Sequence, residues 1–488
     1  MLNPVLRVLR FWRSWISVIA PVVLIAIPLT ADPKNEKAMW CAYNILVCAV
    51  YWICECTPLA ITSLLPVVLL PLTGVVSTND VCINYMKGTN MMFMAGLVMA
   101  IAVEHCGLHI RIALNIIQGV GTSKRMLMLG FMLCAMFLSM WISNTAATAM
   151  MVPIVDAIHK AINTSKEDEL EDGKNNEELE AKLKNSKSRN FLLLSVAYAS
   201  NIGGTGVLTG SPPNLVVVSS LTKEFGQSEV SYATWLAFNI PLMLLNTFAA
   251  WVLLIVIERY VSRHEPQPTP ESELQVKIIL QEKKKELGSM NAHEIQVLIL
   301  FILLVLLWFF LEPVFITGWA SFFEPTKINT ATPAVFIVWL LFLLPQKYGT
   351  KEPSPALLDW HTVEKKLPWG VILLLGGGFA LADASKSSGL SNYMSEQLLS
   401  LRDLEVWQIN LLISFIVTFV TEVASNTATA TIVVPIIMQM SVSLCENPIY
   451  MMMTAAICCS YAFMLPVATA PNAIVFSHST MKTSGTML

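Results

Sequence analysis

Long apolar stretches, separated by polar segments, recur along the whole chain. Many of them reach the ~20 residues that a helix needs to cross the hydrocarbon core of a bilayer. Inside lipid the main chain must satisfy its own hydrogen bonds, which favours helices for such stretches. The pattern predicts apolar segments at residues 15–29, 39–54, 59–76, 91–113, 126–158, 191–221, 235–257, 295–311, 331–345, 369–399, 406–444 and 449–476. The chain is therefore predicted to be an all-α polytopic membrane protein.

Two of these segments are too long for a single simple span. As one helix, residues 126–158 would extend ~50 Å at a rise of ~1.5 Å per residue, against a hydrocarbon core of ~30 Å. The segment at residues 406–444 is longer still. Each segment is therefore expected to hold either two spans or a re-entrant hairpin, in which the chain enters the membrane and returns to the same side.

The distribution of lysine and arginine predicts the orientation. Basic residues concentrate in the polar segments 160–189, 259–285 and 346–366, and Arg7, Arg10 and Arg13 precede the first apolar segment. An excess of Lys and Arg in such segments indicates the cytoplasmic side, so these loops and the N-terminus are predicted to be cytoplasmic. Counting the crossings from there, the two long segments enter the membrane from opposite faces.

Composition agrees with a membrane protein. Of the 488 residues, 55% are hydrophobic and 13% are charged, about half of the roughly 25% charged residues typical of soluble domains. The net charge of -3 comes with no basic stripe, so no nucleic-acid partner is expected. The ten cysteines lie mostly in apolar segments, as packing residues do. The sequence contains no H-E-x-x-H, P-loop or G-x-S-x-G motif, so no enzyme activity is predicted.

The chain contains an internal duplication. Ser-Asn-Thr-Ala occurs in the middle of both long segments, at residues 143–146 and 425–428, an offset of 282 residues. Val-Pro-Ile follows both copies at the same distance. Farther along, Gly-Ser-Pro-Pro-Asn at residues 210–214 resembles Ala-Thr-Ala-Pro-Asn at residues 468–472, an offset of 258. The smaller offset fits an insertion, the charged segment after the first hairpin, in the first copy alone.

The duplication predicts the domain organisation. We expect an N-terminal segment with the first transmembrane helix, two repeats and a cytoplasmic linker between the repeats. The N-terminal segment comprises residues 1–38. The first repeat comprises residues 39–258, with its hairpin at 126–158 and the cytoplasmic insertion at 160–190. The linker comprises residues 259–294, and the second repeat comprises residues 295–488, with its hairpin at 406–444. Since the long segments enter from opposite faces, the repeats are inverted. Inverted repeats are typical of secondary transporters, which bind their substrate near the membrane midplane.

The repeated motif carries suitable chemistry for small ions. Ser, Asn and Thr at a hairpin tip offer oxygen atoms to an alkali cation and donors to a carboxylate. Free main-chain N–H groups at the start of the returning helix favour an anion. The alternative is that these side chains hold helices together. Two copies at inverted positions favour a binding site.

Five ionisable residues also lie within or near apolar segments. They are Glu55, Glu104, His105, Asp383 and Glu422. Ionisable groups at membrane depth are functional candidates by default. The alternative interpretation is structural ion pairing or placement at the membrane interface.

Several motifs together resemble one family. They are Met-Trp-Ile-Ser-Asn-Thr at residues 140–145, Pro-Trp-Gly-Val-Ile-Leu-Leu-Leu-Gly-Gly-Gly at 368–378 and Leu-Pro-Val-Ala-Thr-Ala-Pro-Asn-Ala at 465–473. They closely resemble the divalent anion/sodium symporters, most strongly the animal sodium–dicarboxylate and sodium–citrate (INDY-type) branch. The resemblance covers almost the whole chain. It implies a homodimer, with a scaffold domain and a transport domain that moves substrate and sodium by an elevator mechanism. The expected location of this multi-pass protein is the plasma membrane.

The resemblance also implies two sodium sites and a substrate site. Sodium is co-transported cargo at these sites, rather than a resident cofactor. The first sodium site would use Ser139, Ser143, Asn144 and Gly210, and the second Thr421, Ala424, Asn426 and Ala468. Substrate carboxylates would meet Asn144, Thr145, Ser211, Asn426, Thr427 and Ala470.

The chain departs from the family pattern in two places. Ala470 stands where the family commonly has proline. Family members continue with one further helix beyond the point matching Leu488, so the second repeat is expected to lack its final helix. The expected function is sodium-coupled symport of di- and tricarboxylates such as succinate or citrate. The alternatives are sodium–sulfate symport and a truncated, non-transporting isoform that partners a full-length subunit.

Overall fold

The secondary structure is helical throughout the part of the chain that can be described. The computed structural model describes residues 11–121, 123–167, 187–226, 228–261, 270–313, 316–323, 328–349, 353–391, 393–394, 404–466, 468–479 and 481. Within these ranges the main chain forms no β-strand, and one isolated bridge joins Pro345 and Ala356. The predicted all-α class is confirmed for these residues.

The chain divides into two compact units, each assembled from separate pieces of sequence. Unit one comprises Met1–Met94, Pro212–Val230 and Pro368–Ala462. Unit two comprises Ala95–Ser211, Ser231–Leu367 and Phe463–Leu488. Helix α8 (Gly88–His105) begins in unit one and ends in unit two. Each unit therefore combines residues from both predicted repeats.

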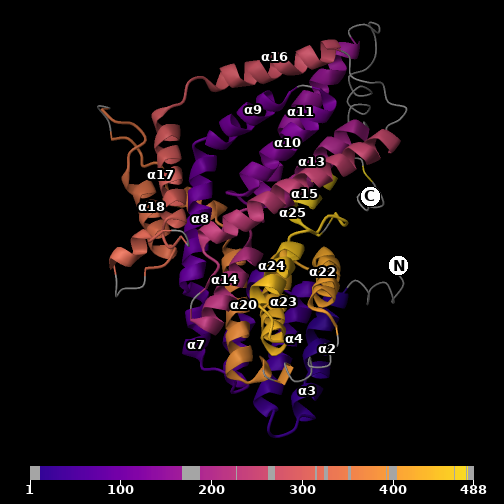
Figure 1. Cartoon of the computed structure of the whole chain (residues 1–488), viewed down its shortest axis with the longest axis vertical. Helices are drawn as coiled ribbons and strands as arrows, with labels where there is room; N and C mark the ends of the chain where they lie inside the picture. Colours follow the sequence, from indigo (N-terminus) through magenta and orange to yellow (C-terminus); the bar gives the residue numbers. More distant parts are fainter. Residues whose placement is uncertain are drawn as a thin grey trace. The chain divides into compact units, whose positions relative to one another are not determined.

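Unit one is built around α4 and α20. Buried side chains of α4, among them Cys48 and Trp52, share a hydrophobic cluster with Leu374 and Leu381 of α20. Helix α23 packs against α24, α14 and α20 (Figure 1). The helices of this unit are α2 (Trp12–Leu24), α3 (Ala26–Leu29), α4 (Glu36–Cys54), α5 (Leu59–Thr62), α6 (Leu65–Leu72), α7 (Thr78–Ile83), η1 (Asn84–Met86), α14 (Pro212–Phe225), α20 (Trp369–Ser387), α22 (Val406–Val423), α23 (Asn426–Ser443) and α24 (Pro448–Cys459).

Unit two centres on α10 and α13, which pack along each other and against α11 and α15 (Figure 1). Phe131 and Met132 of α10 and Val196 of α13 are fully buried. The helices of this unit are α9 (Leu108–Val120), α10 (Lys124–Ser139), α11 (Asn144–Glu167), α13 (Lys187–Gly203), α15 (Tyr232–Val261), α16 (Pro270–Leu287), α17 (Ala292–Phe309), η2 (Trp319–Phe323), α18 (Ala331–Leu343), α19 (Trp360–Lys366) and α25 (Ala470–His478).

Several predicted segments are interrupted rather than continuous. The segment at residues 91–113 was expected to be one span, but α8 ends at His105 and α9 starts at Leu108. Gly107, with a φ of 80°, makes this break, because that left-handed conformation suits glycine and ends a helix. The segments at residues 191–221 and 449–476 are likewise each divided between two helices. The segment at residues 15–29 lies within one candidate span, Trp12–Leu29. Helix α16, which begins at Pro270, lies within the predicted linker at residues 259–294. Of the segment at residues 369–399, positions 392 and 395–399 lie outside the described residues.

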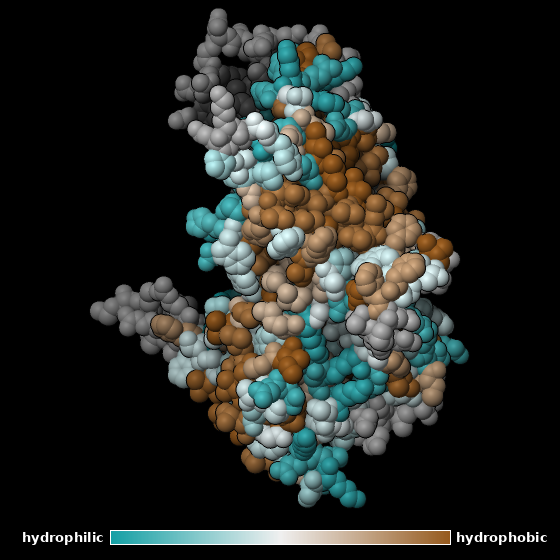
Figure 2. Space-filling model, turned by 90° about the vertical axis from the view of Figure 1, so that its left-hand side faces the viewer, coloured by the Kyte–Doolittle hydropathy of each residue, from teal (hydrophilic) through white to brown (hydrophobic). Residues whose placement is uncertain are grey.

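The surface carries the apolar side chains expected of a membrane protein. Within the described ranges, six helices are long and apolar enough to cross a membrane, or up to seven if α19 and α20 are counted as one span. Large hydrophobic side chains are exposed along α15 and α17, including Leu245, Phe248, Val256, Ile299 and Leu306. Figure 2 shows broad hydrophobic areas of this kind on one face. Side chains of this type face lipid in helical membrane proteins, so the protein is a multi-pass membrane protein.

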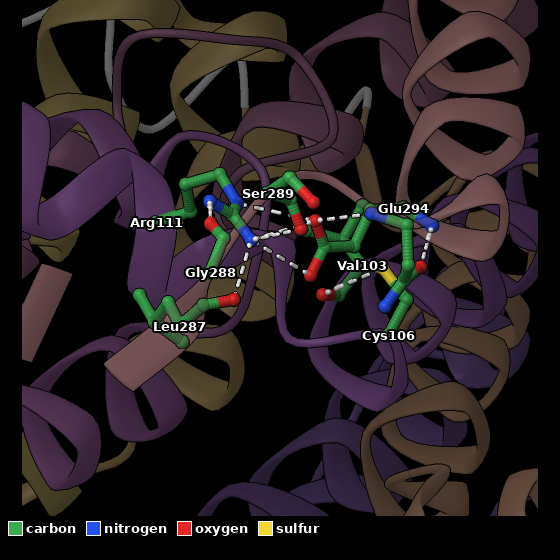
Figure 3. A network of polar contacts seen from close by, with 8 residues as sticks. Val103, Cys106, Arg111, Leu287, Gly288, Ser289 and Glu294 are labelled. Carbon is green, nitrogen blue, oxygen red and sulfur yellow. Dashed lines mark hydrogen bonds and ion pairs between the residues drawn. The ribbon is translucent and has the colours of Figure 1, made fainter. Parts of the chain in front are cut away.

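Within unit two, Arg111 fixes the corner where α16 meets α17. Its guanidinium donates to both carboxylate oxygens of Glu294, at 3.1 and 3.3 Å. It also donates to the main-chain oxygens of Leu287, Gly288 and Ser289, at 3.2, 2.8 and 3.4 Å (Figure 3). Leu287 ends α16, and Gly288 and Ser289 follow it, so these carbonyls lack partners in the helix. The arginine therefore forms an ion pair with a buried carboxylate and donates hydrogen bonds to the carbonyl oxygens at the end of a helix.

Replacing Arg111 is expected to destabilise unit two. The side chains of Arg111 and Glu294 are only 12% and 7% exposed, and breaking a buried pair of this kind costs about 3–5 kcal/mol. Arg111→Ala should lower the apparent melting temperature of the detergent-purified protein, followed by tryptophan fluorescence. Arg111→Lys should recover only part of the loss, because lysine lacks the planar fork that bridges a carboxylate. The matched control is Arg125→Ala, since Arg125 is exposed. A melting temperature of Arg111→Ala equal to that of the control would contradict the structural role.

Candidate functional site

The first long segment folds as a helical hairpin inside unit two. Helix α10 ends at Ser139 and α11 begins at Asn144. The amide of Ile142 donates to the Leu138 oxygen at 2.9 Å, and the amide of Ala147 donates to the Ser143 oxygen at 3.0 Å. Helical hydrogen bonding therefore stops and restarts within a few residues. The first N–H groups of α11 lie at this tip.

The second long segment forms the same kind of hairpin inside unit one. Helix α22 ends at Val423 and α23 begins at Asn426. The amide of Ala424 donates to the Val420 oxygen at 3.0 Å, and the amide of Thr429 donates to the Ser425 oxygen at 2.8 Å. Both long segments thus hold two helices joined by a tight turn, and both turns carry the Ser-Asn-Thr motif.

Three oxygen atoms converge beneath the first hairpin tip. The Ser139 hydroxyl oxygen lies 2.7 Å from Asn144 Oδ1 and 2.6 Å from the main-chain oxygen of Ser200, on α13. A hydroxyl has one hydrogen and can donate fully to only one of these acceptors. The serine is completely buried. The result is a compact set of neutral oxygens of three chemical kinds, a donor set that suits a hard cation.

The second hairpin repeats this arrangement. The Thr421 hydroxyl oxygen lies 2.9 Å from Asn426 Oδ1 and 2.6 Å from the main-chain oxygen of Cys459, on α24. Thr421 is also completely buried. Ser139 and Asn144 recur as Thr421 and Asn426, each 282 residues later. The same hydroxyl, amide and carbonyl oxygens are therefore brought together once in each unit.

Sequence reasoning identified only part of these clusters. It named Ser139, Asn144, Thr421 and Asn426, and the structure brings each pair together. It missed the carbonyl oxygens of Ser200 and Cys459. No side-chain signal could have found them, because every residue has a carbonyl. Their selection depends on how α13 and α24 pack beside the hairpins.

Glycines permit the close approach of the chain to the first hairpin. A β-carbon on Gly204 would lie 2.6 Å from Asn144 Oδ1, too close for any side chain. A β-carbon on Gly210 would lie 2.7 Å from the Gly204 oxygen and 3.0 Å from the Met140 oxygen. The predicted site residue Gly210 therefore lies against the turn of the first hairpin. Gly204 is an additional residue of this site that sequence reasoning did not select.

The remaining predicted residues are divided between the units. In unit two, Ser143 and Thr145 are exposed at the first tip, and Ser211 is buried beside Gly210. Ala468 is half-buried and Ala470 is the exposed first residue of α25 in the same unit. In unit one, Ala424 and Thr427 are buried at the second tip. The residues predicted for the second sodium site and for the substrate site thus come from both units, and their roles stay predictions.

A buried amide supports the loop before α25. Asn201 Nδ2 donates to Thr469 Oγ1 at 3.2 Å and to Asn472 Oδ1 at 3.3 Å. Asn472 Nδ2 in turn donates to the Leu465 oxygen at 3.1 Å. Asn201 was not predicted, although an asparagine inside an apolar segment is a signal for a polar partner. This network fixes the segment that carries Ala468 and Ala470.

Most of the ionisable candidates take part in ion pairs. Glu55 pairs with Arg13, Glu104 with Lys366 and Asp383 with Lys87. The imidazole of His105 lies edge-on to that of His293, at 5.9 Å between ring centres. Glu422 is buried in the last turn of α22, next to Thr421. For Glu55, Glu104 and Asp383, the structure supports the alternative of structural pairing.

The hairpin tips can bind ions without a formal charge of their own. The main-chain N–H groups at the starts of α11 and α23 carry the partial positive charge of a helix N-terminus, which favours an anion. Among the described residues, no group of three or more His, Cys, Asp or Glu side chains is placed to hold a metal ion. The donors gathered at the tips are hydroxyl, amide and carbonyl oxygens, which suit an alkali cation better than a transition metal.

Comparison with known proteins places the chain in a transporter family. A family model described as the sodium:sulfate symporter transmembrane region matches residues 9–487. The Na(+)/citrate cotransporter of Mus musculus is 38% identical over 97% of this chain and 91% of its own length. The sodium-dependent high-affinity dicarboxylate transporter 3 of Caenorhabditis elegans is 40% identical over 92% of this chain and 79% of its own length. The protein I'm not dead yet of Drosophila melanogaster is 35% identical over 97% of this chain and 84% of its own length.

These matches extend over nearly all of the chain and confirm the resemblance indicated by its motifs. The paired hairpins with their Ser-Asn-Thr turns lie inside the matched region. The chain belongs to the sodium:sulfate symporter family.

Proposed function

We propose that this protein is a sodium-coupled symporter of di- and tricarboxylates such as succinate and citrate. One observation carries the proposal: each hairpin gathers a hydroxyl, an amide and a main-chain oxygen at hydrogen-bonding distances around a buried residue, Ser139 or Thr421. Neutral oxygens at interrupted helices are the usual ligands of sodium in secondary transporters. Two such clusters provide for two sodium ions.

The carboxylate groups of the substrate are proposed to meet the hairpin tips. Asn144 and Thr145 are the first two residues of α11, and Asn426 and Thr427 are the first two residues of α23. Their amide and hydroxyl groups donate hydrogen bonds, and the helix starts add a positive dipole. Bound sodium would supply the positive charge that these tips lack. This explains why substrate and sodium would be carried together.

The relatives support carboxylates as the substrate class. Those named above include a Na(+)/citrate cotransporter and a sodium-dependent dicarboxylate transporter. We further propose that the two repeats are inverted, that the protein is a plasma-membrane homodimer with a cytoplasmic N-terminus, and that it works by an elevator movement. The matched hairpins, 282 residues apart, support the repeat.

Uptake by cells expressing the chain tests the proposed function. Labelled succinate, citrate and sulfate should be offered in sodium and in choline medium, with surface expression measured in parallel. We expect uptake of the carboxylates in sodium medium and background uptake in choline. Sulfate uptake without carboxylate uptake would overturn the substrate class. Surface expression without uptake of any of the three would favour a non-transporting partner, which co-expression with a transporting relative would reveal.

Removing the buried hydroxyls should weaken sodium binding. Ser139→Ala and Thr421→Val each delete one oxygen of a cluster, at a cost comparable to a hydrogen bond to a charged group. Each variant should raise the sodium concentration that gives half-maximal carboxylate uptake by about tenfold or more. Thr421→Ser keeps the hydroxyl and should stay near the wild type.

Matched controls are available on the same or a neighbouring helix. Ser195 and Thr418 donate to main-chain oxygens of their own helices, at 2.7 and 2.8 Å. Ser195→Ala and Thr418→Val should leave the sodium dependence unchanged. If the control variants shift it as much as Ser139→Ala and Thr421→Val do, the hydroxyls of the clusters have no special role.

Adding a methyl group at Gly204 should disrupt the first cluster. Its β-carbon would lie 2.6 Å from Asn144 Oδ1, so the amide must move. We expect Gly204→Ala to abolish sodium-dependent uptake while the protein still reaches the surface. Gly119→Ala in α9 is the control, since its β-carbon would meet nothing within 4 Å. Wild-type uptake by Gly204→Ala would show that the position of the Asn144 amide is not critical.

A further inference from the structure

Unit one contains a second candidate site, away from the Ser-Asn-Thr turn. A cavity of about 310 Å³ lies among α4, α14, α20 and α23, and is also lined by Leu390, Ser391, Tyr393 and Met394. These helices pack against one another (Figure 1). Its volume is at the lower end of the range of ~300–1,000 Å³ that is usual for small-molecule sites.

The wall of this cavity is mostly apolar. Helix α4 contributes Met39, Ala42, Ile45 and Leu46, and α23 contributes Ile432, Pro435, Ile436 and Met438. A dicarboxylate is a poor match for such a wall, because a second carboxylate placed against it would lose its hydration without gaining a partner. The long apolar part of an amphipathic molecule fits this surface.

Three charged side chains and one carboxamide also line the cavity. Lys223 and Glu224 of α14, Lys386 of α20 and Gln439 of α23 line the cavity. Glu224 accepts from Gln439 Nε2 at 3.2 Å and pairs with Lys386 at 3.0 Å. The four side chains come from three helices, so they form a preassembled polar group.

This cluster carries more positive than negative charge. Asp383 pairs with Lys87 at 3.2 Å and also with Lys223. Together with the Lys386–Glu224 pair, three ammonium groups therefore share two carboxylates. The Nζ atom of Lys223 is buried, and an ammonium group has three donor hydrogens. One further anionic group would balance the cluster and accept hydrogen bonds from Lys223 and Lys386.

We propose that this cavity binds the carboxylate of a long-chain fatty acid, with the head group at Lys223 and Lys386 and the acyl chain against α4 and α23. The single negative charge matches the net charge of the cluster, and the apolar wall matches the chain. Such molecules partition into the bilayer, which brings them to a membrane protein.

The site adjoins the helix that carries the second hairpin motif. Thr431, Pro435 and Gln439 line the cavity, and the same helix, α23, begins at Asn426. A molecule bound in the cavity would therefore contact the helix that positions Asn426. This consequence for transport rests on the proposed function, whereas binding of the fatty acid does not.

Direct binding tests the proposal. Tritiated palmitate should be titrated against the purified full chain by scintillation proximity, without sodium or dicarboxylate, so that the result is independent of transport. We expect saturable binding that hexadecanol, which lacks the carboxylate, competes for weakly. Lys223→Gln and Lys386→Gln should each weaken palmitate binding by about tenfold, the usual effect of losing a hydrogen bond to a charged group.

A second variant tests the apolar wall. Ala42→Trp would fill the part of the cavity lined by α4 and should abolish saturable binding. The controls are Lys277→Gln and Ala249→Trp, both at exposed positions, which should bind palmitate as the wild type does. The Lys223 variant leaves Asp383 paired with Lys87, so folding should be preserved.

The outcomes separate this proposal from the proposed function. Weakened binding by the cavity variants but not by the controls supports the site, even if the chain transports nothing. Absence of saturable binding, or equal binding by all variants, overturns it, even if sodium-dependent uptake is normal. Equal competition by hexadecanol would also overturn the role of the two lysines.

Discussion

A helix that stops inside an apolar region leaves main-chain N–H and C=O groups without their usual partners, and these groups must find others. The breaks at residues 140–143 and 424–425 both carry the repeated Ser-Asn-Thr motif, and at the first of them the Ser143 hydroxyl accepts from the amide of Ala146 at 3.2 Å. Ser139 and Thr421 lie just before the breaks, and each contacts an asparagine side chain that follows its break and a carbonyl oxygen of a neighbouring helix. Each break therefore brings neutral oxygen atoms of different kinds together.

Formal charges are used elsewhere in the molecule. Arg111 is held by Glu294 and by the end of α16, and Asp383 joins Lys87 and Lys223. These pairs connect helices that are distant in sequence. They hold the helices of each unit in one relative position, which a non-directional apolar contact would not do. The two oxygen clusters at the hairpin tips, in contrast, consist of neutral groups, which in the proposed sites would bind and release an ion without carrying a charge themselves.

Much of the helical architecture could be predicted from the sequence, but not all of its breaks. Length alone indicated that residues 126–158 and 406–444 hold two helices each, and the duplication at an offset of 282 located the turns. The break at Gly107 was missed, because one glycine in a continuous apolar run does not by itself end a helix. The carbonyls of Ser200 and Cys459 could not be predicted, since main-chain atoms leave no trace in the residue pattern. The two units could not be predicted either, because their pieces alternate along the chain.

The neutral composition of the two oxygen clusters has a consequence for protons. Hydroxyl, carboxamide and peptide oxygens do not titrate between acid and alkaline pH, unlike carboxylates or imidazoles. In the proposed sodium sites, a cation entering such a cluster would displace no proton from the hydroxyl, carboxamide and peptide groups. In the proposed transport cycle, these clusters would add no charge of their own, so the net charge moved would be set by the number of cations and by the ionisation state of the cargo.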